Sequence, residues 1–308
     1  MTTYDTHVTN RRKVLQCMAW GSAGLLWTVA GGVPRARALD QLAADPPAKD
    51  FSFVQISDSH IGFNKDANPM PDATLRDALG RVAALSPRPA FLLHTGDVTH
   101  LSKPAEFDAA EQIMKTSALE TYYVPGEHDV INDEGKSFFE RFGRNKTAGG
   151  WYSFDQAGIH FVGLVNVVNL KAGGLGFLGS DQLAWLANDL KSRSASTPIV
   201  VFAHMPLWAL YPQWGWGTDD AAEALTSLKR FGSVTVLNGH IHQVMQKVEG
   251  NVSFQTAMST AFPQPAPGNG PGPGPMLVPA EKLKSVLGIR RIDFAQGKPR
   301  ISDTSLAG

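Results

Sequence analysis

Two histidines separated by one residue, His240 and His242, follow a β-branched apolar run at residues 234–237. Imidazole nitrogens are common metal ligands near neutral pH. Because side chains alternate along a strand, histidines at positions i and i+2 would share a face and could reach one site. Gly239 lets the backbone come close to whatever occupies that site. The pair alone is equally typical of two solvated loop histidines, so a metal site requires further ligands.

Other apolar runs also end in residues that can bind metal. Four such runs cover residues 51–56, 90–93, 121–124 and 198–202. The candidate ligands that follow them are Asp58, His60, Asp97, Glu127, His128 and His204. Ligands of open α/β sheets bind beyond the carboxyl ends of the strands, which predicts that these side chains meet at one place. Carboxylates and imidazoles together suit ions such as Zn, Fe, Mn or Co.

Two such ions would give the site a definite chemistry. A pair of ions bridged by one carboxylate and one hydroxide makes the hydroxide a nucleophile at neutral pH. The same ions neutralise the oxygens of a phosphoryl group during an in-line displacement. The sequence shows no catalytic serine or cysteine motif, which fits direct attack by water.

The elements that position these residues alternate along the chain. Helical patterns cover residues 72–85, 103–115, 180–191 and 218–229 between the strand-like runs. Residues 151–164 have the pattern of a hairpin, and further strands are expected at 244–247, 252–257 and 288–294. This alternation predicts a layered α/β domain with two packed sheets and helices outside. The Pro/Gly tract at 263–275 is expected to be a surface loop, since proline excludes helix and central strand.

The composition is that of a globular protein. The chain has 308 residues, of which 43% are hydrophobic and 18% are charged, enough for one large or two modest cores. The formal net charge is zero, so bulk electrostatics gives no reason to expect a nucleic-acid partner. The one cysteine, Cys17, excludes a disulfide framework and a cysteine-type zinc site.

The N-terminal region resembles a twin-arginine export signal. Paired arginines at 11 and 12 precede an apolar, Gly- and Ala-rich stretch at 17–33 and the sequence Ala36-Arg37-Ala38. We therefore expect a signal peptide at 1–38, a linker at 39–50 and a single folded domain at 51–308 that carries the candidate ligands. The twin-arginine machinery would then deliver the protein to the periplasm with no stable membrane anchor. A disordered basic tail and an uncleaved anchor helix are the alternatives.

The metal-ligand motifs resemble those of the calcineurin-like metallophosphoesterase superfamily, and in detail those of its class III cyclic-nucleotide phosphodiesterase-like branch. They follow the family order: Asp58-x-His60, Gly96-Asp97, Gly126-Glu127-His128-Asp129, His204 and Gly239-His240-x-His242. The resemblance implies a four-layer α-β-β-α sandwich of two mixed sheets with a dinuclear site at the strand C-terminal ends. It also implies hydrolysis of a small phosphate ester, diester or monoester, by a metal-bridging hydroxide.

The resemblance assigns a role to each position. Asp58, His60 and His242 would hold one ion. His204, His240 and Glu127 would hold the other, and Asp97 would bridge the two. His128 would contact the phosphate and protonate the leaving oxygen, while Asp129 would orient His128 through a hydrogen bond. Asp129 could instead be a helix cap.

Glu127 departs from the family pattern, which has asparagine there. A carboxylate adds one negative charge and one methylene group to the site. We expect Glu127 to remain a ligand and to favour a harder or trivalent ion such as iron. The candidates for the two metal ions are Fe, Mn and Zn. The added charge should disfavour a dianionic monoester more than a monoanionic diester.

Four further features have open interpretations. His94 is expected to be a buried structural residue or a support for a ligand. His100 is expected to lie at the rim of the cleft or on the ordinary surface. His160 is expected to be a structural residue within a strand. An aromatic cluster could stack on a base or form a local loop core; it comprises Trp208, Tyr211, Trp214 and Trp216. The whole fold could also be a non-catalytic metal-binding scaffold for protein interaction.

Overall fold

The computed structural model describes residues 25–30, 33–38, 50–144, 149–295 and 297–307. The chain divides into two units, with the boundary between Pro46 and Pro47. In the first unit, β1 (Leu25–Ala30) pairs antiparallel with β2 (Val33–Ala38). The paired arginines of the expected export signal, and all of the expected linker except Asp50, lie outside the described residues.

The second unit contains two mixed sheets. The first has the order β13-β12-β3-β4-β5, in which β3, β4 and β5 are parallel and β12 runs antiparallel to β3 and β13. Its strands are β3 (Phe51–Ile56), β4 (Leu92–His94), β5 (Thr121–Tyr123), β12 (Gly288–Ala295) and β13 (Lys298–Ser305). Because β12 pairs with β3, the chain beyond the Pro/Gly tract returns to the sheet in which it began.

The second sheet has the order β10-β11-β9-β8-β7-β6. Its strands β7, β8, β9 and β11 are parallel, while β6 and β10 are antiparallel at the two edges. The bounds are β6 (Tyr152–Gln156), β7 (Ile159–Gly163), β8 (Ile199–Phe202), β9 (Val234–Asn238), β10 (Met245–Glu249) and β11 (Val252–Thr256). The predicted hairpin at 151–164 is therefore confirmed as β6 and β7.

The predicted helices are confirmed, the one at 180–191 with the predicted bounds and the other three with shifted ends. They are α2 (Pro71–Ala83), α3 (Pro104–Lys115), α5 (Ser180–Lys191) and α6 (Ala221–Leu228). Two short helices without a clear sequence pattern, α4 (Lys136–Phe142) and α7 (Ala280–Val286), were not predicted. Single turns of 3-10 helix occur at η2 (Glu127–Asp129), η3 (Ala172–Gly174) and η4 (Pro212–Trp214). No helix in the described ranges is both long and apolar enough to cross a membrane.

Alternation along the strands creates three apolar layers. In β3, Val54 and Ile56 pack with α2 and α3, whereas Phe53 packs in an aromatic-rich layer against the other sheet. In β8, Val200 and Phe202 belong to the same inter-sheet layer, whereas alternate residues pack with α5 and α6. A strand that is buried on both faces has a nearly continuous apolar sequence. Burial between a helix layer and the other sheet therefore explains the apolar runs of β3 and β8. The predicted four-layer α-β-β-α sandwich is confirmed.

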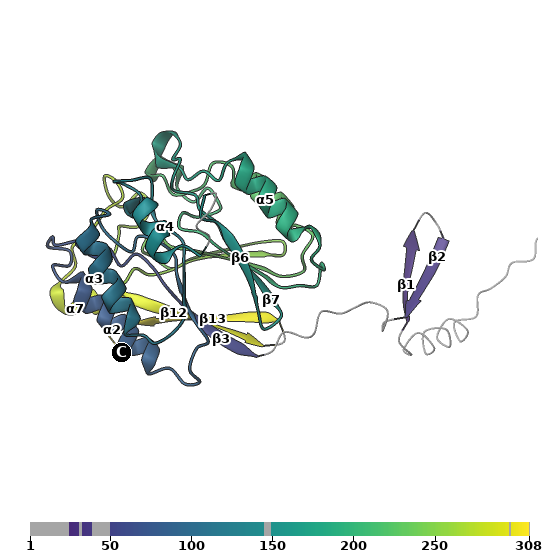
Figure 1. Cartoon of the computed structure of the whole chain (residues 1–308), viewed down its shortest axis with the longest axis horizontal. Helices are drawn as coiled ribbons and strands as arrows, with labels where there is room; N and C mark the ends of the chain where they lie inside the picture. The colour runs from purple at the N-terminus through teal and green to yellow at the C-terminus, as the bar shows by residue number, and fades with distance from the viewer. Residues whose placement is uncertain (1–24, 31–32, 39–49, 145–148, 296, 308) are drawn as a thin grey trace, which may run out of the picture. The chain divides into compact units, whose positions relative to one another are not determined.

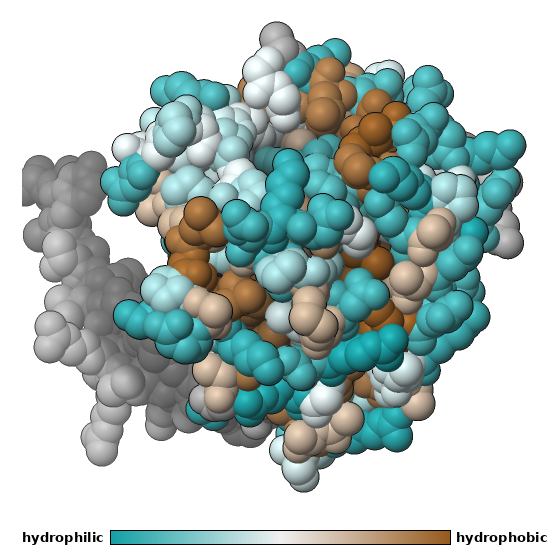
Figure 2. All heavy atoms as spheres, turned by 90° about the vertical axis from the view of Figure 1, so that its left-hand side faces the viewer, coloured by the Kyte–Doolittle hydropathy of each residue, from teal (hydrophilic) through white to brown (hydrophobic). Residues whose placement is uncertain are grey.

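Figure 1 shows the layers, with α2, α3 and α7 on one side of the strands and α5 on the other. Figure 2 looks at the side that carries α2, α3 and α7. This face is largely hydrophilic, with hydrophobic residues in several separate spots. The Pro/Gly tract has neither helix nor strand between β11 and α7, in agreement with the sequence prediction.

Candidate metal centre

The structure brings the predicted ligands together in the loops that follow β3, β4, β5, β8 and β9. Six of them are buried: Asp58, His60, Asp97, His204, His240 and His242. Glu127, in η2, is only partly buried. Within this set, several groups of three have ligand atoms within 4.8 Å of one another.

Most of these ligands have left-handed backbone, which strand logic does not predict. Positive φ angles between 41° and 70° occur at Asp58, His60, Asp97, His240 and His242. Such backbone costs residues with a Cβ roughly 1–2 kcal/mol, although Asp and His adopt it more readily than most. For the His240-x-His242 pair, the expected strand alternation is wrong, because β9 ends at Asn238. The two histidines lie instead on bent backbone after β9 and reach different ligand groups.

The first group consists of Asp58, His60 and His242. Nε2 of His242 lies 3.4 Å from Oδ1 of Asp58 and 3.2 Å from Nε2 of His60. The other ring nitrogen of His242, Nδ1, contacts the carbonyl oxygen of Phe262 at 2.5 Å. A carbonyl only accepts, so Nδ1 carries the proton and the lone pair of Nε2 faces the group.

The second group consists of Glu127, His204 and His240. Glu127 Oε2 lies 2.7 Å from His204 Nε2, and Oε1 lies 3.0 Å from His240 Nδ1. His204 Nδ1 donates to the Thr95 carbonyl at 2.7 Å, which leaves Nε2 as the inward ligand atom. Despite these distances, Glu127 Oε2, His204 Nε2 and both ring nitrogens of His240 are buried without a hydrogen bond among the described residues.

Asp97 lies between the two groups. Its Oδ2 is 3.5 Å from Nε2 of His60 and 3.4 Å from Nε2 of His204. Its Oδ1 accepts a hydrogen bond from the backbone N–H of His128 at 2.9 Å. Several of these atoms lack a hydrogen-bond partner among the described residues, and carboxylate oxygens and imidazole nitrogens gathered in one small buried volume suit two cations. The residues present therefore fit a dimetal site, with Asp97 lying between the two groups.

In the protein without metal ions, the charged groups of the site shift one another's pKa values. Burial by itself would raise the pKa of Asp58, but His242 and His204 bring it down to about 2. Burial likewise opposes ionisation of Glu127, and His240 and His204 outweigh it and hold the pKa well below the usual range. Burial lowers the pKa of His60, and the neighbouring His128 lowers it further. The carboxylates of Asp58 and Glu127 are thus ionised and can bind cations.

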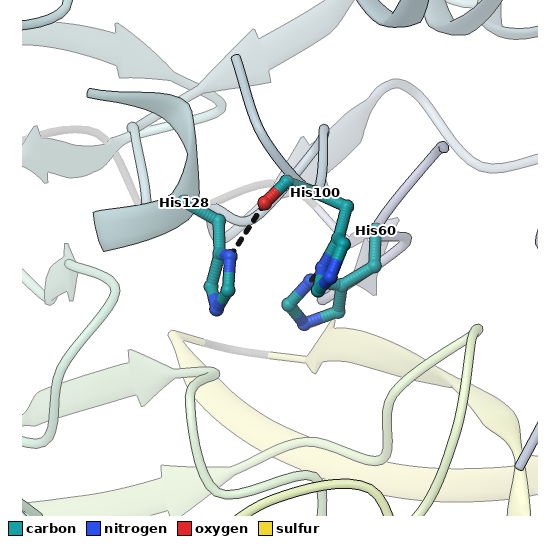
Figure 3. Close-up of side chains that lie close together, drawn as sticks. All are labelled: His60, His100 and His128. Atoms are coloured by element: carbon teal, nitrogen blue, oxygen red, sulfur yellow. Dashed lines mark hydrogen bonds between the residues drawn. The ribbon is translucent and has the colours of Figure 1, made fainter. Parts of the chain in front are cut away.

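The predicted hydrogen bond between Asp129 and His128 is wrong. Nδ1 of His128 contacts the carbonyl oxygen of His100 at 2.6 Å (Figure 3). The Asp129 carboxylate instead accepts from the backbone N–H groups of Val98, Thr99 and Gly126 and from the Thr99 hydroxyl. Asp129 closes η2, so its side chain turns back toward Gly126, as in the alternative of a helix cap. It holds the loops after β4 and β5 together.

The remaining histidines have distinct places. His94 is buried, its Nε2 lies 2.8 Å from the Ser59 hydroxyl, and burial lowers its pKa to about 3. It therefore supports the turn between Asp58 and His60 as a neutral ring. His160 is buried in β7 with Nδ1 2.9 Å from Asp155 and Nε2 2.7 Å from Asp189, a structural arrangement as predicted. His100, partly buried, contacts both His60 and His128.

The aromatic cluster after β8 is mainly a local loop core. Trp208 is buried and packs on Phe254, with ring centroids 5.2 Å apart. Trp216 is fully buried and contacts Trp214, which in turn contacts Tyr211. Burial of Trp208 and Trp216 removes their faces from any ligand, so the interpretation of stacking on a base is wrong for these two residues.

One contributing segment was missed in the sequence. After β11, Ser259 Oγ donates to the Asp58 carbonyl at 2.7 Å, and Gln264 Nε2 donates to the His240 carbonyl at 2.9 Å. The Phe262 carbonyl fixes His242, and its ring packs against His60 and His242. The sequence predicts a strand at 252–257, and this strand, β11, is the parallel partner of β9 and ends beside the ligand loops.

Gly239 makes the close approach that the sequence suggested. A Cβ atom there would lie 2.0 Å from Ser57 Oγ and 2.7 Å from Asp58 Oδ2. We expect Gly239→Ala to push Asp58 aside and to weaken metal binding by roughly 10- to 100-fold, as perturbed ligand support does. Equilibrium dialysis of the folded variant measures this.

Gly80→Ala is the matched control for that substitution. Gly80 lies within α2, and a Cβ added there meets no atom within 4 Å. Alanine is favoured over glycine inside a helix by roughly 0.5–1 kcal/mol, so this variant should keep wild-type metal affinity and melt slightly higher. Unchanged metal affinity in Gly239→Ala would mean that Asp58 is not a ligand or that the turn relaxes freely.

Comparison with known proteins agrees with this geometry. The family model for calcineurin-like phosphoesterases matches residues 51–244. A probable cyclic nucleotide phosphodiesterase of Vesicomyosocius okutanii is 26% identical over 221 residues, covering 69% of this chain and 87% of that protein. A 3',5'-cyclic-nucleotide phosphodiesterase of Nostoc is 25% identical over 219 residues, covering 69% of this chain and 79% of the relative.

Among solved structures, a dimetal phosphatase from Danio rerio superposes with a TM-score of 0.61 at 15% identity, covering 85% of this chain and all of that one. This likeness concerns the fold. The family model covers most of the chain and includes every predicted ligand, and the ligand atoms converge in two buried groups around Asp97. The chain therefore belongs to the calcineurin-like phosphoesterase family and is a dinuclear-metal phosphoesterase.

Proposed function

We propose that this phosphoesterase hydrolyses a small phosphodiester of the cyclic-nucleotide kind and that the protein acts after export. The observation that carries the diester preference is the position of Glu127, whose carboxylate contacts both His204 and His240. Two relatives named as cyclic nucleotide phosphodiesterases support the substrate class.

The charge of the site favours a monoanion. Three carboxylates face the two ligand groups, from Asp58, Asp97 and Glu127. Against two divalent cations they leave a net charge of about +1, where asparagine at position 127 would leave about +2. A phosphodiester carries one negative charge and a monoester near neutral pH carries close to two. The extra carboxylate should therefore disfavour the monoester more.

The residues divide the work of hydrolysis. One ion would be held by Asp58, His60 and His242. The other would be held by Glu127, His204 and His240. Asp97 would bind both ions. When bound, such ions supply Lewis acidity to the phosphoryl oxygens and activate water. His128, with Nδ1 fixed by the His100 carbonyl, presents Nε2 as the donor that protonates the leaving oxygen. Asp129 fixes the loops that carry Asp97 and His128.

A substrate panel tests the proposal. Metal analysis of the purified protein should find two ions per chain, with iron, manganese and zinc as the candidates. The same preparation should hydrolyse a cyclic nucleotide or another diester with a higher kcat/KM than the matching monoester. A protein with full metal content and no turnover on any phosphate ester would instead support the alternative of a non-catalytic scaffold.

Glu127→Asn is expected to shift substrate preference toward monoesters. Removal of one charge at a few ångströms in a partly buried site changes electrostatic energy by one to several kcal/mol, so the diester/monoester ratio should fall roughly tenfold. The metal bound by His204 and His240 should also change in affinity or identity. The measurement is kcat/KM on a matched diester and monoester, with metal analysis. If neither the ratio nor the metal changes, Glu127 does not tune the site.

Export is proposed from the N-terminal sequence, where Arg11 and Arg12 precede an apolar stretch and Ala36-Arg37-Ala38. The twin-arginine route carries folded proteins, so the metals could be loaded before translocation. Replacement of both arginines by lysine should retain the protein in the cytoplasm, and cell fractionation tests this. Equal periplasmic amounts of variant and wild type would contradict this route.

A further inference from the structure

His100 lies where two histidines of the site meet. Its ring stacks on that of His128, with centroids 4.9 Å apart and planes inclined by 16°. Its carbonyl accepts the Nδ1–H of His128, and its own Nδ1 lies 3.4 Å from Nδ1 of His60 (Figure 3). A single residue thus contacts both the predicted proton donor and a predicted metal ligand.

The loop around His100 is held by hydrogen bonds on both sides of the residue. The N–H of His100 donates to the Ile61 carbonyl at 2.9 Å. On the far side, buried Glu106 accepts from the N–H of Leu101 at 2.7 Å, and Ser102 Oγ donates to the His128 carbonyl at 2.6 Å. These bonds fix the loop on both sides of His100 and so the Cα from which its imidazole reaches His60.

The donor and the acceptor in the contact between Nδ1 of His60 and Nδ1 of His100 can be assigned. Nε2 of His60 faces Asp97 and His242, at 3.5 Å and 3.2 Å, where its lone pair is required for a cation. The proton of a neutral His60 ring is then on Nδ1. His60 therefore donates, and Nδ1 of His100 is the acceptor.

Two other histidines of the predicted ligand set also donate from their outward ring nitrogens, but to different partners. His204 donates to the Thr95 carbonyl and His242 to the Phe262 carbonyl, both of which belong to the backbone. For His60 the acceptor is a side chain, and it can therefore be removed by substitution. Outer partners of this kind set the tautomer and orientation of a ligating imidazole, and their loss typically weakens metal affinity 10- to 100-fold.

We propose that His100 is a positioning residue that fixes His60 through its Nδ1 atom, and that it controls the affinity for the ion held by Asp58, His60 and His242. This inference rests on the ligand assignment of the proposed function. It predicts a selective effect, because the second ion is held by residues that His100 does not contact in this network.

Two substitutions of His100 test the effect of its acceptor atom separately from the effect of its ring. His100→Asn places an amide oxygen at about the distance of Nδ1 from the backbone but removes the ring. His100→Phe keeps a ring to stack on His128 but removes the acceptor. Both leave the backbone carbonyl that accepts from His128. The full-length protein, stripped and reloaded with Zn²⁺ alone, is titrated against a competing chelator.

We expect His100→Phe to bind one of its two zinc ions 10- to 100-fold more weakly and the other with wild-type affinity. His100→Asn should bind both ions much as the wild type does. Wild-type binding of both ions by His100→Phe overturns the inference, and so does equal weakening in the two variants, which would indicate packing. A third zinc ion in the wild type that His100→Phe loses also overturns it, since His60, His100 and His128 would then form a separate site.

Two further measurements keep the test decisive. His60→Ala should lose one ion; if it retains both, the ligand assignment itself fails, which is distinct from failure of the role of His100. In the zinc-loaded wild type, ¹⁵N NMR of the imidazoles reports the tautomers without any substitution. Protonation of His60 on Nδ1 and of His100 on Nε2 is expected, and a His100 ring protonated on Nδ1 overturns the inference.

Discussion

Replacement of His128 by alanine is expected to lower kcat by about 10²- to 10⁴-fold while both metal ions remain bound. The bond from Nδ1 of His128 to the His100 carbonyl leaves Nε2 as the atom that can deliver a proton. Burial by itself lowers the pKa of His128, but Asp97 and Glu127 outweigh it and raise the pKa above its ordinary value. In the protein without metal ions, the His128 ring therefore stays protonated at higher pH than a free histidine.

The leaving group provides a sharper measurement than kcat alone. An alkoxide, such as the ribose oxygen of a cyclic nucleotide, is a poor leaving group and needs a proton as the P–O bond breaks. A p-nitrophenolate leaves without one. If His128 is the general acid, the loss of kcat in His128→Ala should be large on the alkyl diester and small on the matching p-nitrophenyl diester.

Ile131→Ala is the matched control. Ile131 is in the same loop, its side chain is 54% exposed, and its structural hydrogen bond is made by the backbone N–H. This variant should retain near wild-type turnover on both esters. Equal losses on the two esters in His128→Ala would contradict proton donation and leave His128 only a role in binding the phosphate. Loss of metal from the variant would place His128 among the ligands.

The ligands could be predicted because two independent signals coincide in the sequence. Runs such as Phe51–Ile56 are apolar on both faces, which is typical of strands covered on both sides. Asp58, Asp97 and His204 then follow strand ends, where the fold places binding residues. The residue types identify the chemistry and the topology brings them together, so neither signal required knowledge of the exact turns.

Features that depend on backbone geometry were not predictable in the same way. The left-handed φ angles of His240 and His242 have no marker in residue type beyond the mild tolerance of histidine. The resemblance to the family predicts a hydrogen bond between Asp129 and His128, its neighbour in sequence. In the structure the carboxylate bonds to Val98 and Thr99, about thirty residues away in sequence. Such pairing depends on how two loops meet, which no local pattern records.

Asp97→Asn is expected to weaken the binding of both metal ions together and to lower kcat/KM by about 10³-fold or more, since metal ions contribute several kcal/mol to such reactions. Oδ2 of Asp97 lies 3.5 Å from His60 Nε2 in one group and 3.4 Å from His204 Nε2 in the other. Loss of its charge therefore affects both groups. Asparagine is the appropriate replacement because it tolerates the φ of 52° and can still accept from the His128 N–H.

The number of ions lost distinguishes a bridging ligand from an ordinary one. His60→Ala and His240→Ala should each lose one ion, and a different one, whereas Asp97→Asn should lose affinity for both in a single chelator titration. Glu134→Asn is the control, since Glu134 is exposed and also has left-handed backbone, with φ of 55°. It removes a carboxylate at the same kind of backbone position and should leave both affinities unchanged. If Asp97→Asn loses only one ion, Asp97 belongs to one group, and the two metals are held independently of each other.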